Sequence, residues 1–77
     1  MRGRIASLLA GTERQNGNLL AAEQYAREAI PLWEGRGDRW RLAEARHLLG
    51  MVLYEQKRFA EAADLLQKVL AFFIPHV

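Results

Sequence analysis

The side chains that could bind a metal or act as a nucleophile are few and far apart in this sequence. There are two histidines, His47 and His76, and no cysteine. His47 can meet Glu44 across one helical turn, but a zinc site needs three or four converging ligands. The single serine, Ser7, has no sequence neighbour that could activate it for nucleophilic attack. The sequence therefore predicts no metal site and no nucleophilic catalysis.

The carboxylates and glycines do not form a catalytic pattern either. Glu61 and Asp64 are neighbours on one helix surface, whereas acid–base catalysis needs a pocket that tunes such groups. The segment Gly35-Arg36-Gly37 lacks the third glycine and the strand–loop–helix setting of a phosphate-binding loop. We therefore expect a protein that is not an enzyme and that uses no cofactor.

Arginines gather around Trp40, in the pattern by which a protein can grip phosphates and stack bases. Acidic residues lie in the same stretch, however, and the formal net charge is only +2. We expect Trp40 to cover the junction between two helical hairpins, and we rank nucleic-acid binding below protein binding. The arginines are Arg36, Arg39, Arg41 and Arg46, and the acidic residues are Glu34, Asp38 and Glu44.

The start of the chain resembles a bacterial signal peptide, with a basic segment at residues 1–4 and an apolar one at 5–11. The apolar run is short for that purpose, and Thr12 stands where a lipoprotein signal has cysteine. No apolar run approaches the roughly 20 residues that span a membrane. We expect no membrane span and a cytoplasmic location.

The apolar residues repeat at an offset of 40 positions. In both halves the steps between them are three, four, three, one and three residues, which place them on one helix face. Since 51% of the residues are hydrophobic, such helices can bury a core. The first set is Leu19, Ala22, Ala26, Ala29, Ile30 and Trp33, and the second is Phe59, Ala62, Leu66, Val69, Leu70 and Phe73.

This pattern predicts an all-α fold of two stacked antiparallel helical hairpins. We expect one domain over residues 1–77, with the first repeat at about 3–36 and the second at about 38–76. The helices are expected at residues 3–16, 19–34, 39–56 and 59–73. Asn18 and Asp38 stand where the second and third helices need N-caps. Pro31 lies inside the second helix and is expected to kink it.

The second half of the chain resembles the tetratricopeptide repeat. In that family the first helix has a Leu-Gly pair with a large residue three positions on. The second helix has an alanine, a large residue four positions later and a small residue three beyond that. The matching residues are Leu49, Gly50 and Leu53, followed by Ala62, Leu66 and Val69.

The first half matches less well, because Glu13 stands where the family has a large apolar residue. The repeat of 40 residues is also longer than the usual length of about 34. In this it is similar to the longer repeats of bacterial signalling ATPases and transcription regulators.

The resemblance implies a scaffold that binds a peptide or a partner helix in a groove lined by the first helix of each repeat. The alternative is a small structural subunit or fragment of a larger assembly with no ligand of its own, and a nucleic-acid-contacting regulator ranks third. Ordinary solvated helix surface is the competing interpretation of the groove positions. By position these are Arg4, Ser7, Gly11, Arg14 and Gln15, then Glu44, His47, Leu48, Met51, Tyr54 and Glu55.

The last helix has more apolar residues than the third helix can cover, and a contiguous apolar patch is typical of an interface. The partner at this edge is expected to be a second copy, related by a two-fold axis, or a different protein. Alternatively, the last helix frays and its aromatic side chains fold back on the third helix. The edge residues are Leu66, Val69, Phe72, Phe73 and Ile74.

Overall fold

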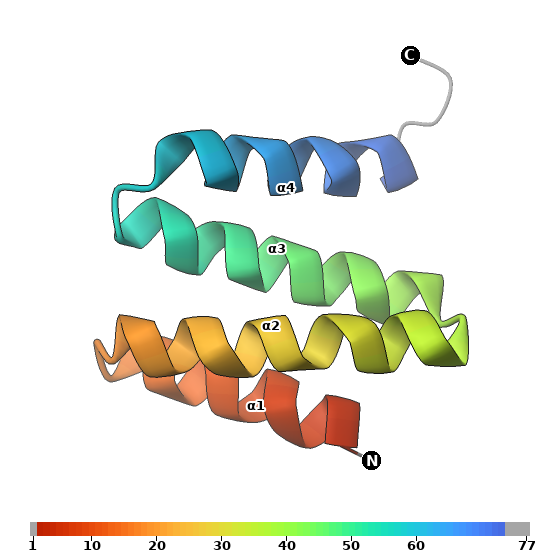
Figure 1. The fold of residues 1–77 in the computed structure, drawn as a ribbon, viewed down its shortest axis with the longest axis horizontal. Coiled ribbons are helices and arrows are strands. Elements are labelled where there is room, and N and C mark those ends of the chain that lie inside the picture. The colour runs from red at the N-terminus through yellow and green to blue at the C-terminus, as the bar shows by residue number, and fades with distance from the viewer. Residues whose placement is uncertain (1, 74–77) are drawn as a thin grey trace.

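The computed structural model describes residues 2–73, with side chains from residue 4 onward. Within this range the chain forms four α-helices, which lie one after another in chain order (Figure 1). The first hairpin consists of α1 (Arg2–Gln15) and α2 (Leu19–Arg36), and the second of α3 (Arg39–Glu55) and α4 (Phe59–Phe73). The predicted all-α fold of two stacked hairpins is confirmed, and each helix boundary lies within two residues of its predicted position.

The helix ends follow from local backbone chemistry. The Asp38 carboxylate accepts a hydrogen bond from the Arg41 backbone N–H at 3.0 Å, so it caps α3 as predicted. The Asn18 side chain makes no capping bond to α2, which corrects the prediction. Its Nδ2 instead donates to the Glu13 carboxylate at 3.4 Å. The α2 helix continues through the exposed Pro31 to Arg36, so the proline does not end it.

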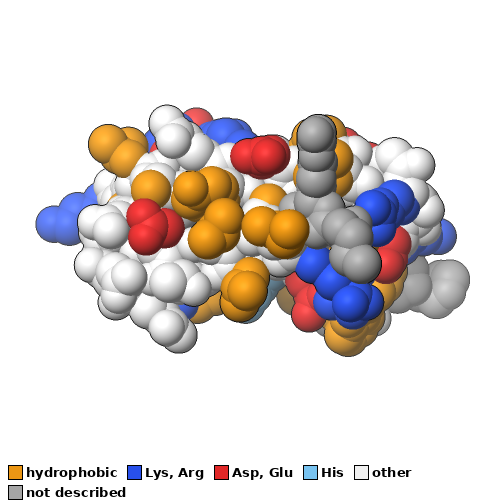
Figure 2. All heavy atoms as spheres, turned by 90° about the horizontal axis from the view of Figure 1, so that it is seen from below, with side chains coloured by type: hydrophobic (Ala, Val, Ile, Leu, Met, Phe, Trp, Pro, Cys, Tyr) orange, Lys and Arg blue, Asp and Glu red, His pale blue; other side chains and the backbone are white. Residues whose placement is uncertain are grey.

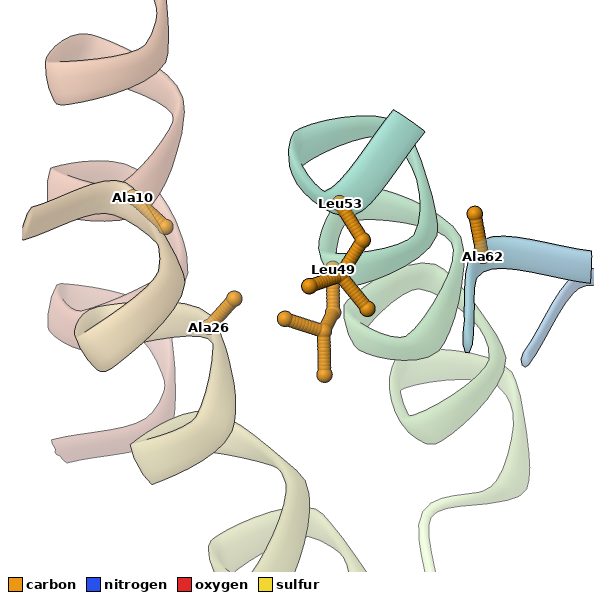
Figure 3. Close-up of a cluster of buried hydrophobic side chains, with 5 residues drawn as sticks. All are labelled: Ala10, Ala26, Leu49, Leu53 and Ala62. Atoms are coloured by element: carbon orange, nitrogen blue, oxygen red, sulfur yellow. The ribbon is translucent and has the colours of Figure 1, made fainter. Parts of the chain in front are cut away.

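A core of alanines and leucines joins the two hairpins. Leu49 and Leu53 of α3 lie between alanines of the first hairpin and Ala62 of α4 (Figure 3). Because Ala10 and Ala26 have only a methyl group, α1 and α2 can approach the leucines closely. Burial of the two leucines against both hairpins stabilises the stack by roughly 1.5–3 kcal/mol each.

A second cluster lies near the other end of the helices and also crosses the junction between the hairpins. It consists of Ala6, Ala29, Trp33 and Ala45, so α1, α2 and α3 all contribute to it. Trp33 is therefore the tryptophan that fills the junction. The prediction for Trp40 was wrong, because its ring packs within the second hairpin, 5.5 Å from the ring of Phe73.

Candidate functional site

The predicted groove face contains a hollow of about 540 Å³ between the first helices of the two hairpins. The α1 helix contributes Arg4 and Ser7, and α3 contributes Glu44 and His47 from the other side. These four residues were all predicted to line the groove. The hollow therefore brings together two residues of α1 and two of α3, although the two helices are far apart in the sequence. The remaining lining residues are Leu8, Trp33, Arg41 and Leu48.

Positive charge gathers at this end of the face. A neighbouring hollow of about 490 Å³ shares Arg4, Trp33 and Arg41 with the first and adds Arg36 and Asp38. The guanidinium carbons of Arg36 and Arg41 lie 5.5 and 5.8 Å from the centre of the Trp33 ring. Such cation–π contacts hold the two guanidinium groups over a buried ring. The arrangement can bind an anionic group between Arg4 and Arg41.

Sequence reasoning missed three of the lining residues, Leu8, Trp33 and Arg41. Trp33 was expected in the core, and it is buried there, but it also borders the hollow. Arg41 precedes Glu44 by three residues and therefore lies on the same helix face. Its guanidinium is 3.8 Å from the Glu44 carboxylate. This spacing is the signal that could have identified Arg41.

The other end of the predicted groove is closed by a contact between two of its own residues. Arg14 of α1 donates from Nε to the Glu55 carboxylate of α3, so these two side chains bind each other across the hairpins. Both remain partly exposed, and such a pair contributes up to about 1 kcal/mol. The neighbouring Gln15 is exposed.

Met51 and Tyr54 occupy the middle and far end of the α3 face. Met51 is half-buried, whereas Tyr54 is exposed and its ring lies 5.2 Å from that of Phe59. Tyr54 follows His47 by seven residues, a rise of about 10 Å along the helix. A ligand that contacts both residues must therefore run along α3 rather than sit only in the hollow.

The predicted apolar edge on α4 is smaller than expected. Val69 is only 8% exposed and belongs to the interior of the hairpin, so its inclusion in the edge is corrected. Leu66 and Phe72 are half-buried, and Phe73 remains 52% exposed. Ile74 lies outside the described residues. The rings of Phe72 and Phe73 pack edge-on against Trp40 of α3, as the alternative predicted, but α4 stays helical through Phe73 rather than fraying.

A polar cluster that the sequence did not predict ties α2 to the turn between α3 and α4. The Glu23 carboxylate accepts hydrogen bonds from Arg58 at 2.8 Å, from Gln56 at 3.0 Å and from Arg27 at 2.9 Å. Burial raises the pKa of Glu23, but these hydrogen bonds together outweigh it, and the pKa lies below its ordinary value. The cluster is therefore a structural contact between the hairpins.

Two further observations concern the described part of the chain. No three histidine, aspartate or glutamate side chains in residues 4–73 are grouped as a metal ion requires. None of the four helices is long and apolar enough to cross a membrane.

The comparison with known families identifies the architecture. A family model described as a tetratricopeptide repeat matches residues 2–74. Because the match covers nearly the whole chain, the chain belongs to the tetratricopeptide repeat family, as its residues indicated. No curated protein and no solved structure matches it. Repeats of this family generally mediate protein–protein interactions, since stacked hairpins present extended surfaces to a partner.

Proposed function

We propose that this chain is a non-catalytic module that binds a peptide or a partner helix along the face formed by α1 and α3. The observation that carries the proposal is the hollow in which Arg4 and Ser7 of α1 meet Glu44 and His47 of α3. A binding face built from both repeats can recognise one extended ligand. The cytoplasmic location and the likeness to the longer bacterial signalling repeats stay predictions.

The charges of the face favour an acidic group on the ligand. Arg4, Arg36 and Arg41 surround the two hollows, and only Asp38 and Glu44 oppose them there. Charge-assisted hydrogen bonds between guanidinium and carboxylate groups are among the strongest that a protein surface makes. Further along α3, the half-buried Met51 and the exposed Tyr54 offer apolar contact to the remainder of the ligand.

The test is selection of ligands from a displayed library of random peptides, followed by affinity measurement on purified variants. Replacing His47 and Tyr54 together by alanine should weaken a selected peptide at least about tenfold, equivalent to about 1.4 kcal/mol. Helicity by circular dichroism should stay unchanged, because Tyr54 is exposed and neither residue belongs to the core clusters. Gln24→Ala on the exposed side of α2 is the matched control and should bind as the unmodified protein does.

The outcomes separate the alternatives. Equal affinity in the double variant would place the ligand on another face. Failure to select any peptide would favour a structural subunit without a ligand of its own. Binding that nucleic acid competes for, and that falls steeply with salt, would favour the nucleic-acid-contacting regulator.

We also propose that the exposed edge of α4, with Leu66, Phe72 and Phe73, is an interface. The supporting observation is that Phe73 and the neighbouring Leu70 are each more than half exposed. Both are large apolar side chains on the same helix as the buried Ala62 and Val69. Complete burial of a large apolar side chain stabilises a protein by roughly 1.5–3 kcal/mol, and these half-exposed side chains forgo part of that amount.

A further inference from the structure

The two ends of the stack of helices both expose large apolar side chains. At the first end, Ile5, Leu8 and Leu9 of α1 are exposed, and Leu8 reaches 71%. Figure 2 shows this end of the molecule, where hydrophobic side chains gather over α1. The α2 helix packs against Ala6 and Ala10 of α1. Tyr25 and Glu28 of α2 border Ile5 and Leu9 but shield them only in part, and Leu8 stays largely exposed.

The second end is the part of the α4 surface that α3 leaves exposed, and Phe59 and Phe73 touch Tyr54 and Trp40 of α3 at its border. Phe59, Leu70 and Phe73 are exposed there, and Leu66 between them is half-buried. The steps from residue 59 to 66, 70 and 73 are seven, four and three, so the four side chains form one stripe along the helix.

The equivalent positions of the second repeat, on α3, are covered by α2 of the same chain. They show how the exposed positions of α1 pack when a preceding hairpin is present. Forty positions after Ile5, Leu8 and Leu9 stand Ala45, Leu48 and Leu49 of α3. Ala45 and Leu49 are buried against alanines of α2, and Leu48 is half-buried beside them. The exposed residues of α1 therefore occupy the positions with which α3 contacts the preceding hairpin.

The same comparison explains the second end. Forty positions before the α4 stripe stand four residues of α2, and all of them are buried or half-buried. Ala26 and Trp33 are buried in the two core clusters, and Ile30 packs against both clusters. The full α2 set is Leu19, Ala26, Ile30 and Trp33. The two exposed ends are thus the two halves of one interface that the chain already forms once.

We infer that the α4 end of one copy binds the α1 end of a second copy, in the relation that α2 has to α3 within the chain. The inference rests on the proposal that the α4 edge is an interface, and it specifies the surface that occupies it. The contact is heterologous, so each copy keeps one free end and further copies can add in the same direction.

This contact differs from the internal one in ways that weaken it. In the contact between copies, Ala63 of α4 in the first copy takes the place of Glu23 of α2. Asn18 of the second copy takes the place of Arg58. The ion pair that ties α2 to the second hairpin is therefore absent between copies. Bulkier residues also replace small ones, since Leu66 takes the place of Ala26 and Ile5 that of Ala45. Association is consequently reversible and depends on protein concentration.

Two charge-introducing substitutions test the inference by analytical ultracentrifugation of the full chain. Leu8→Asp blocks the α1 end and Phe73→Asp blocks the α4 end. The unmodified protein should form a concentration-dependent series of species, and each variant alone should sediment as a monomer. An equimolar mixture of the two variants should form a heterodimer and nothing larger, because each supplies the end that the other lacks.

The matched control is Leu20→Asp, since Leu20 is 72% exposed but lies outside both stripes and should leave association intact. Circular dichroism verifies that each variant is folded. If loss of the contact between Phe73 and Trp40 unfolds the first choice, Leu70→Asp blocks the same end, because Leu70 takes no part in the aromatic contacts of α4.

Three results would overturn the inference, and each does so differently. A monomeric unmodified protein at every concentration would leave both ends without a second copy as partner. Self-association that survives Leu8→Asp but not Phe73→Asp would keep the α4 interface and show a two-fold pairing of α4 with α4. Association that survives Phe73→Asp and Leu70→Asp would remove α4 from the interface altogether.

Discussion

Gly50 of α3 packs directly against Leu66 of α4. A Cβ on residue 50 would lie 3.1 Å from Cδ2 of Leu66 and 3.7 Å from the Ala62 carbonyl oxygen. The absence of a side chain at this position therefore sets how closely the two helices of the second hairpin approach. The Leu49-Gly50 pair that suggested the family is thus a packing requirement of the hairpin.

We expect Gly50→Val to destabilise the protein by about 1–3 kcal/mol, because the branched side chain must displace Leu66 or separate α3 from α4. Urea unfolding followed by circular dichroism measures the change. Gly11→Val in α1 is the control, since a Cβ there meets nothing within 4 Å and valine forms helix more readily than glycine. Equal effects of the two substitutions would contradict the packing role of Gly50.

The spacing of apolar residues was enough to predict the four helices, because that spacing decides which side of each helix is buried. The Asp38 cap was also predictable, since an N-cap acts within one turn of its own helix. The buried Leu49 and Leu53 and the family follow from the same pattern.

The sequence did not show which side chains meet across helices. Arg14 and Glu55 were both placed on the groove, but their bond to each other depends on how the hairpins stack. Likewise, both tryptophans are apolar and near the turn, and only the packing shows that Trp33 rather than Trp40 fills the junction. Val69 was expected at the exposed edge of the last helix. It is buried, because α3 covers more of α4 than the spacing of apolar residues indicated.

Lys57 adopts a left-handed backbone conformation that suits glycine, with φ of 65°. The equivalent residue of the first repeat, forty positions earlier, is Gly17, with φ of 83°. A residue with a side chain loses about 1–2 kcal/mol of stability in this conformation. Glycine avoids this loss, but part of the gain is offset because glycine makes the unfolded chain more flexible. We expect Lys57→Gly to stabilise the protein by about 0.5–1 kcal/mol and to raise Tm by about 2–8 °C.

Thermal unfolding measures this gain, and Lys57→Ala is the matched control. Alanine removes the same charge but still carries a Cβ, so it should give no comparable stabilisation. A gain of the same size in both variants would assign the effect to the charge instead of the backbone.

The Glu23 cluster makes stability depend on pH in acid. The folded-state pKa of Glu23 lies below its ordinary value of 4.5, because the hydrogen bonds from Gln56, Arg27 and Arg58 outweigh the effect of burial. The folded protein therefore binds this proton less readily than the unfolded chain does. The resulting stabilisation is fully present above the unfolded pKa and is lost as the pH falls through the folded pKa.

We expect Glu23→Gln to lower the free energy of unfolding at neutral pH by about 1 kcal/mol, since a neutral amide accepts weaker hydrogen bonds from the two arginines. The variant should also lose less stability than the unmodified protein as the pH falls below about 5. Urea unfolding at a series of pH values measures both effects. A parallel pH dependence in the two proteins would show that Glu23 does not carry the acid sensitivity.

Glu61→Gln is the control for this experiment, because Glu61 binds the same guanidinium group in a more exposed setting. The hydrogen bond from Arg58 lowers the pKa of Glu61 as well, but its side chain is 51% exposed whereas that of Glu23 is 12% exposed. Salt screens exposed charges far more than partly buried ones. The effect of Glu61→Gln should therefore vanish at high salt, whereas that of Glu23→Gln should persist because its carboxylate links the two hairpins.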